Sequence, residues 1–136
     1  MVEASLIARR LEQTARAVYD DRGPKAIHPG QWAVLRYLAR AARESRTVGG
    51  VADHLGVTHA PASRAVAALA RKRLVEIETD AHDRRVRRIG LTAAGRELLA
   101  RDPVHRLTAA IDDLADTDRR ALAATLDRLF AILARA

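Results

Sequence analysis

The sequence predicts a mainly α-helical domain that carries one small β-hairpin. Apolar residues recur at helical spacing over most of the 136 residues, whereas the short stretches LVEIET and RIGLT alternate apolar and polar residues as strands do. The length is that of one domain, and it suffices to bury a core without a disulfide or a metal ion. We therefore expect residues 1–136 to fold as a single domain.

Two helices are expected in the first third of the chain, separated by a break. The first covers residues 5–18, and the segment DDRGPKAIHPGQ then interrupts the pattern with two glycines and two prolines. Pro29 suits the first position of the next helix, because the N–H that proline lacks has no partner there. This second helix, in QWAVLRYLARAAR, has an apolar stripe broad enough to face a core on two sides.

Two short helices joined by a glycine turn are expected over residues 47–73. Thr47 can cap the first helix, and Gly56 stands where a left-handed residue would end it. Thr58 can cap the second helix, which tolerates Pro61 because first-turn N–H groups have no helical partner. A helix-turn-helix has this pattern, although a plain helical hairpin would share it. The residues expected to face inward from the second helix are Ala62, Val66 and Leu69.

A β-hairpin is expected directly after these helices. Val75 and Ile77 alternate with glutamates in the first strand, which predicts a half-buried strand with these two residues on its inner face. Ile89 and Leu91 share one face of the second strand, and the turn-rich DAHDRR lies between the two. The run Arg84–Arg88 contains four arginines, so it is either a solvated loop or a surface that meets phosphate. A basic hairpin after a helix-turn-helix indicates a winged helix, whose wing reaches the DNA backbone or the minor groove.

Positive charge is concentrated in this middle region. The chain has a net charge of +7 and a pI of about 11.1. Residues 58–88 hold eight Lys or Arg against four Asp or Glu, whereas residues 89–136 are neutral overall. This distribution indicates an acidic partner for the region predicted to be a winged helix.

The C-terminal third predicts helices with more apolar surface than a small winged domain can cover. Thr92 can cap a helix that is disturbed at Pro103, and Asp116 is expected to be the N-cap of the last helix. Apolar residues of that last helix repeat at helical spacing at Leu122, Leu126, Leu129 and Leu133. We expect this surface and the first helix to be buried when two chains pair.

The run from Leu55 to Gly95 resembles the MarR family of winged-helix repressors, and HPGQWAVLRYL and THAPASR are also similar to family segments. The family pattern of D-R-R, an apolar alternation, L-T and a glycine stands here as Asp83, Arg84, Arg85, Ile89, Leu91, Thr92 and Gly95. The resemblance implies a homodimeric repressor of transcription that binds double-stranded DNA at a near-palindromic operator. It assigns residues 29–91 to the winged helix and residues 1–20 and 92–136 to helical dimerisation.

The resemblance also implies which residues contact DNA. The recognition-helix positions are Thr58, His59, Pro61, Ser63 and Arg64. Arg85 matches the wing arginine that enters the minor groove, and Asp83 matches an acidic residue that orients the wing. Arg84 and Arg87 extend the same basic tip, while Lys72 is either a phosphate contact or a solvated helix end. The chain departs from the family pattern at Gly50, Pro61 and Arg73, which leaves the preferred DNA sequence open.

Family regulators respond to small ligands, so a small aromatic or phenolic effector is implied. Its pocket candidates are Tyr19, His28, Trp32 and Tyr37, although a core position is the more common explanation for a tryptophan such as Trp32. A winged helix can also serve as a protein-interaction module or as a non-specific DNA-binding architectural protein, and these alternatives stay open.

Several classes of protein are disfavoured by what the sequence lacks. It has no cysteine, so disulfides, thiol catalysis and cysteine-ligated metals are excluded. The five histidines show no metal-ligand spacing, and no phosphate-binding loop, H-E-x-x-H or nucleophile-elbow motif occurs. We therefore expect no enzyme, no cofactor and no metal site. Without a long apolar run or a signal-like N-terminus, we expect a cytoplasmic protein with no membrane span.

Overall fold

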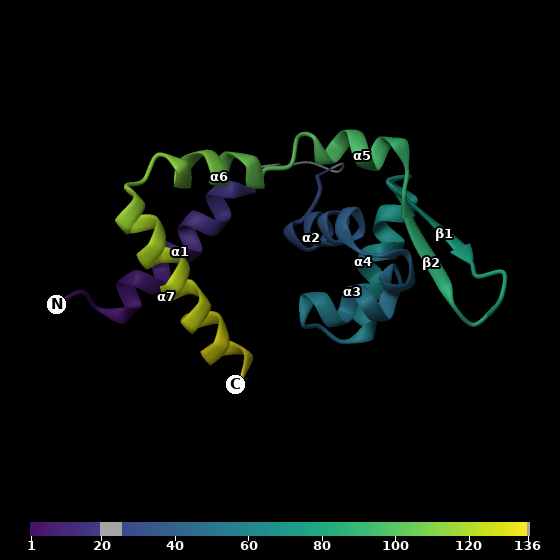
Figure 1. Ribbon diagram of the computed structural model, residues 1–136, viewed down its shortest axis with the longest axis horizontal. Helices are drawn as coiled ribbons and strands as arrows, with labels where there is room; N and C mark the ends of the chain where they lie inside the picture. The colour runs from purple at the N-terminus through teal and green to yellow at the C-terminus, as the bar shows by residue number, and fades with distance from the viewer. Residues whose placement is uncertain (20–25, 136) are drawn as a thin grey trace. The chain divides into compact units, whose positions relative to one another are not determined.

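The computed structural model describes residues 1–19 and 26–135, which belong to two compact units. One unit joins Met1–Val18 with Pro103–Ala136, and the other is Tyr19–Asp102. The mainly helical fold with one antiparallel hairpin is confirmed (Figure 1). No helix in the described parts is long and apolar enough to cross a membrane.

The Tyr19–Asp102 unit contains the helix-turn-helix and the hairpin. Its elements are α2 (Pro29–Arg40), the 3-10 helix η1 (Arg43–Ser45), α3 (Val48–Leu55), α4 (His59–Arg71), β1 (Val75–Thr79), β2 (Arg87–Leu91) and α5 (Ala93–Leu99). As predicted, Pro29 begins α2, the Thr47 hydroxyl accepts the Gly50 N–H at 3.0 Å, and Gly56 ends α3 with φ +65°. The unit includes α5 and so extends beyond residues 29–91. The predicted break before α2 falls largely on residues 20–25, which lie outside the described residues.

The core of this unit is formed where α2, α3 and α4 meet the hairpin. Ala62, Val66 and Leu69 of α4 are all buried, as their helical spacing predicted. They belong to one cluster with Leu35 of α2 and Ile89 of β2. Burial of this α4 face turns the opposite face of the helix to solvent.

Less of the hairpin is buried than the sequence predicted. Val75 pairs with Leu91 and is buried, but Ile77, which pairs with Ile89, is 43% exposed. The prediction that Ile77 packs inward with Val75 is therefore wrong. Only the first residue of β1 is buried, and the rest of the strand projects beyond the core as a wing. The Ile89 N–H donates to the Arg46 carbonyl at 2.8 Å, which ties β2 to the segment before α3.

A compact junction joins the hairpin to α4 and α5. The Thr92 hydroxyl donates to the Arg73 carbonyl at 2.8 Å and accepts the Gly95 N–H at 3.0 Å, so it caps α5 as predicted. A Cβ on Gly95 would lie 2.2 Å from the Leu74 carbonyl oxygen, which requires glycine at this position. Arg73 has φ +60°, a left-handed conformation that glycine adopts without strain. Arg73 therefore holds a backbone conformation that costs free energy in a residue with a side chain.

The other unit consists of α1 (Ala4–Val18), α6 (Val104–Asp112) and α7 (Asp116–Ala134). The predicted N-cap of the last helix is wrong by one residue, because Ala115 is the N-cap and Asp116 is the first helical residue. There the Asp116 carboxylate lies near the positive end of the helix and pairs with the Arg120 Nε at 2.9 Å.

Gly50 lies where α3 approaches η1 and α2 most closely. The Tyr37 hydroxyl donates to the Ser45 carbonyl at 2.6 Å. A Cβ on Gly50 would lie 2.1 Å from that same carbonyl oxygen and 2.6 Å from the Tyr37 hydroxyl. A Cβ on the neighbouring Gly49 would make only an ordinary van der Waals contact, 3.8 Å from the Thr47 hydroxyl oxygen. This close approach leaves no room for a side chain at position 50.

We expect Gly50→Ala to lower the free energy of unfolding by about 2 kcal/mol, because the added methyl group meets backbone that cannot move away. Gly49→Ala is the matched control, and we expect it to raise stability by about 0.5 to 1 kcal/mol through helix propensity alone. Urea unfolding of both variants measures the difference. Equal stabilities for the two variants would contradict the close approach at Gly50.

Candidate nucleic-acid interface

The front of α4 presents polar side chains to solvent. Thr58 is the N-cap residue, but its side chain makes no capping hydrogen bond, so its hydroxyl is not used in closing the helix. His59 and Arg64 are exposed, and Pro61 and Ser63 are half-buried. Because the buried face of α4 is fixed in the core, these residues are held on a rigid outward face. This arrangement is the one expected of a helix that reads the edges of bases.

A hollow of about 450 Å³ brings the recognition helix and the wing together. It is lined by Thr47, Val48 and Gly49 at the start of α3, by His59 and Ser63 of α4, and by Arg85, Val86 and Arg87 of the wing. Four of the predicted site residues therefore border one surface. The start of α3 also borders this surface, although its sequence indicated only a helix cap.

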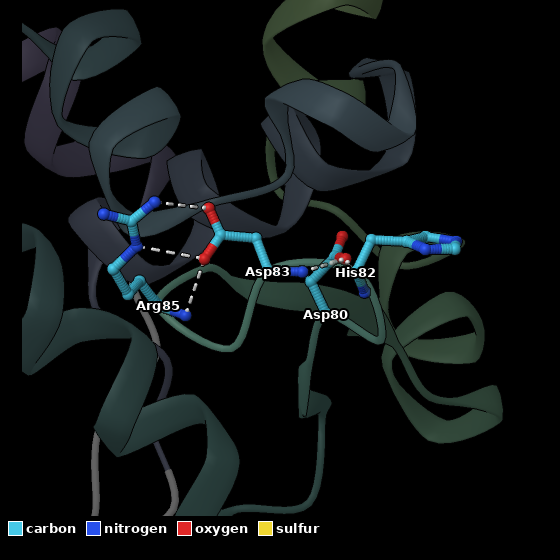
Figure 2. A network of polar contacts seen from close by, with 4 residues as sticks. All are labelled: Asp80, His82, Asp83 and Arg85. Atoms are coloured by element: carbon cyan, nitrogen blue, oxygen red, sulfur yellow. Dashed lines mark hydrogen bonds and ion pairs between the residues drawn. The ribbon is translucent and has the colours of Figure 1, made fainter.

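The wing turn is held by two aspartates, of which the sequence predicted only Asp83. The Asp80 Oδ1 accepts the backbone N–H groups of His82 at 2.8 Å and Asp83 at 3.1 Å. The Asp83 Oδ1 accepts both the backbone N–H and the Nε of Arg85 at 3.1 Å, and its Oδ2 accepts Nη2 at 3.3 Å. Figure 2 shows the Arg85 guanidinium facing the Asp83 carboxylate, with the His82 ring on the other side of the turn. An aspartate that accepts N–H groups two and three residues ahead is a recognisable turn signal, which could have identified Asp80.

The four arginines of the wing divide into two groups. Arg88 points back to the protein, with its Nε 3.3 Å from the Asp80 Oδ2 and its Nη1 2.8 Å from the Glu44 carbonyl oxygen. Arg84, Arg85 and Arg87 are exposed, and the Arg85 side chain is 92% exposed even while it is paired with Asp83. An ion pair so open to water adds little to stability. Its effect is to limit the directions in which the Arg85 guanidinium points.

The aspartate pKa values follow from these bonds. Hydrogen bonds from the side chain and then the backbone of Arg85 lower the pKa of the Asp83 carboxyl. The backbone N–H groups of His82 and Asp83, followed by Arg88, lower the pKa of Asp80. Both carboxylates therefore stay charged at every pH near neutrality.

The hydrogen-bond partners of Lys72 are not residues of the hollow between α4 and the wing. Its Nζ donates to the Ala26 carbonyl at 2.9 Å and to the Gln31 Oε1 at 2.9 Å. The same Gln31 oxygen accepts the His28 backbone N–H at 3.2 Å. Lys72 thus joins the end of α4 to the start of α2, and the geometry gives it a structural contact in place of a free ammonium group.

The four pocket candidates take separate places in the Tyr19–Asp102 unit. Trp32 is 4% exposed and belongs to the core, while His28 is the N-cap residue of α2. The Tyr19 hydroxyl accepts a hydrogen bond from Arg36. Tyr37 stacks on His54 with ring centres 4.8 Å apart and borders a hollow of about 210 Å³. Across residues 1–19 and 26–135, no group of three His, Asp or Glu could hold a metal ion.

The region from α2 to the wing matches a known family. Residues 27–86 match the family model described as the MarR family. The winged helix therefore has the sequence pattern of the MarR family. The matched residues include the whole of α4 and the wing turn, so they contain the surface formed by His59, Ser63 and Arg85. No curated protein sequence matches the chain.

Solved structures share the fold over nearly the whole chain. The MepR–DNA complex from S. aureus aligns with a TM-score of 0.80 and 22% identity, over 98% of this chain and 99% of that chain. A probable transcriptional regulator from Pseudomonas aeruginosa gives 0.76 and 22%, over 93% and 96%. The PcaV regulator from Streptomyces coelicolor, in complex with its natural ligand, gives 0.75 and 20%, over 96% and 93%. The chain thus shares its fold with these transcription regulators.

We expect NMR titration to place the pKa of Asp83 below the ordinary aspartate value of about 3.9, because Arg85 stabilises the charged form. Arg85→Ala should raise the Asp83 pKa part of the way back to the ordinary value, because the backbone N–H of residue 85 still donates to the carboxylate. The stabilisation from this pair is complete above the ordinary value and is lost only as the pH falls through the lowered pKa. Arg84→Ala, which removes an arginine with no bond to Asp83, is the control. An Asp83 pKa unaffected by Arg85→Ala would contradict the pairing.

Proposed function

We propose that the protein is a sequence-specific DNA-binding transcription regulator, that it acts as a homodimeric repressor, and that a small ligand releases it from DNA. The observation that carries this proposal is the hollow shared by His59 and Ser63 of α4 and Arg85 and Arg87 of the wing. One rigid surface thereby offers base-reading groups and cations together. The concentration of positive charge in residues 58–88 supports the same partner.

The proposed DNA contacts divide by chemistry. In this proposal, base edges and adjacent phosphates in the major groove are contacted by residues at the front of α4, namely Thr58, His59, Pro61, Ser63 and Arg64. Arg84, Arg85 and Arg87 are exposed for the backbone or a narrow minor groove, and Asp83 restrains Arg85. A related fold, MepR, has been solved as a DNA complex, which supports this mode of docking. Lys72 is left out of the proposed contacts because its ammonium group already bonds to Ala26 and Gln31.

The homodimer is proposed from apolar surface on α1 and α7. Phe130 is 74% exposed, Ile132 and Leu133 are each 64% exposed, and Ile7 of α1 is 54% exposed. Single chains rarely leave so many large apolar side chains in water, so a partner surface is required. A second copy supplies one with the same chemistry and by symmetry presents two recognition helices about 10 base pairs apart. A near-palindromic operator follows from that symmetry.

Repression would follow from occupancy of a promoter, and release from a ligand that favours a different arrangement of the dimer. PcaV, a structure of the same fold, contains its natural ligand, which supports a small effector here.

Tyr37 and His54 stack beside a hollow that would suit an aromatic or phenolic molecule. A regulator of this kind would act in the cytoplasm.

We expect Arg85→Ala to weaken binding to the operator by about 1 to 3 kcal/mol and to reduce the salt slope by about 1, because a cation near phosphate is lost. Arg64→Ala should weaken binding to the operator more than binding to shuffled duplex. Arg96→Ala removes an equal charge from exposed α5 and is the control. Gel-shift titration against the chain's own upstream DNA, at several salt concentrations, measures all three.

Equal affinity of the unmodified protein for operator and shuffled duplex would contradict sequence-specific binding and favour an architectural protein. No DNA affinity at all in a folded protein would favour a protein-interaction module.

We expect Leu126→Asp to shift the protein from dimer to monomer in sedimentation experiments, because Leu126 is 39% exposed on α7 and a buried carboxylate would oppose pairing. Operator affinity should fall with the loss of the second half-site contact. Asp127→Ala changes the adjacent exposed residue and should leave the dimer intact. A monomeric unmodified protein would refute the dimer directly.

A further inference from the structure

One arginine of α2 contacts both places at which the chain passes from one unit to the other. The units divide between Val18 and Tyr19, and again between Asp102 and Pro103. Arg36 donates from Nε to the Asp102 Oδ2 at 2.6 Å and from Nη2 to Oδ1 at 2.7 Å. The same Nη2 donates to the Tyr19 hydroxyl at 3.1 Å. We call Tyr19, Arg36 and Asp102 the junction clamp.

The junction clamp has the properties of a persistent contact. Asp102 is 5% exposed, and the Arg36 side chain is 25% exposed, so solvent screens their pairing only weakly. Two parallel N–H bonds to one carboxylate fix direction as well as distance. The bond to Asp102 raises the pKa of the Arg36 guanidinium above its usual value, so the arginine is charged at every relevant pH. The guanidinium carbon also lies 5.8 Å from the centre of the Tyr19 ring.

Arg36 belongs to the element that anchors the DNA-binding core. Val34, Leu35 and Leu38 of the same helix are at most 2% exposed and pack in the cluster that fixes α4. The guanidinium is therefore held in register with the recognition helix. Pro103 follows Asp102 directly, and a residue before proline has a restricted backbone. The chain thus leaves the clamp in a limited range of directions.

We propose that Arg36 is a positioning residue that sets how far apart the two DNA-binding units of the dimer are held, and hence which half-site spacing the protein accepts. This inference rests on the proposed function, because it needs a dimer that reads two half-sites. Within the Tyr19–Asp102 unit, one side chain holds both residues at which the chain enters and leaves that unit. If these contacts are lost, the whole winged unit can move more freely. The dimer would then accept a wider range of half-site spacings, although no residue that contacts DNA has changed.

The first test measures affinity for operators in which the half-site separation is changed by one or two base pairs. For the unmodified protein, we expect a one-base-pair change to weaken binding by about tenfold or more. Arg36→Lys keeps the charge but loses the fork, and Asp102→Asn keeps the shape but loses the charge. Both variants should bind the native operator more weakly and should distinguish much less between spacings. Arg101→Lys alters the exposed neighbour of Asp102 and is the control.

A second test needs no DNA. The chain lacks cysteine, so Glu78→Cys on the wing and Thr117→Cys on α7 accept spin labels at two exposed sites only. Labelled chain diluted into excess unlabelled chain reports distances within one chain, whatever its oligomeric state. We expect Arg36→Lys to broaden the distance distribution relative to the labelled chain without that change. Circular dichroism and thermal unfolding identify variants that have lost their fold.

These measurements separate the two proposals. Folded Arg36→Lys and Asp102→Asn variants with an unchanged distance distribution would overturn the clamp, as would a spacing preference equal to that of the unmodified protein. A variant that is less stable but keeps its spacing preference would show a purely structural ion pair and would also overturn it. If the unmodified protein shows no specific DNA binding, the proposed function fails, and the distance distribution alone still decides the clamp.

Discussion

Burial of one face of α4 is the constraint on which the rest of the molecule depends. Ala62, Val66 and Leu69 are fixed in the core by α2 and by Ile89 of the hairpin. The polar front of α4 is outward only because this face is inward. The wing depends on the same packing, since β2 is held by Ile89 in the core and by its N–H bond to Arg46. The site is therefore a product of the core, and variants that loosen the core would affect it indirectly.

Local patterns predicted much of the fold and part of the site. The helical spacing of α4, the capping residue Thr47 and the left-handed Gly56 were each readable, because their causes lie within a few neighbouring residues. Ile77 was predicted wrongly, because alternation indicates which residues share a face but not where a strand leaves the core. The grouping of His59 with Arg85 was implied by family resemblance and not by spacing alone.

Contacts between distant residues were beyond the sequence. Arg36 and Asp102 are separated by 66 positions, and no periodicity connects them. The charge of Lys72 and its position at the end of α4 suggested a phosphate contact, yet its ammonium group donates hydrogen bonds to Ala26 and Gln31. The resemblance included Gly95 in its pattern and marked Gly50 as a departure, but each glycine is required by a particular backbone oxygen that the fold brings close to it. Such constraints arise only when helices and strands pack together, so local sequence patterns cannot predict them.

The turn held by Asp80 has a consequence for the speed of recognition. Its carboxylate accepts the backbone N–H groups of His82 and Asp83, and Asp83 accepts that of Arg85, so these bonds restrict the wing turn before any partner binds. The conformational entropy of the tip is therefore lost during folding and does not have to be lost again on association. A preordered tip favours encounters that need no rearrangement of the wing, which lets charge attraction govern the association rate.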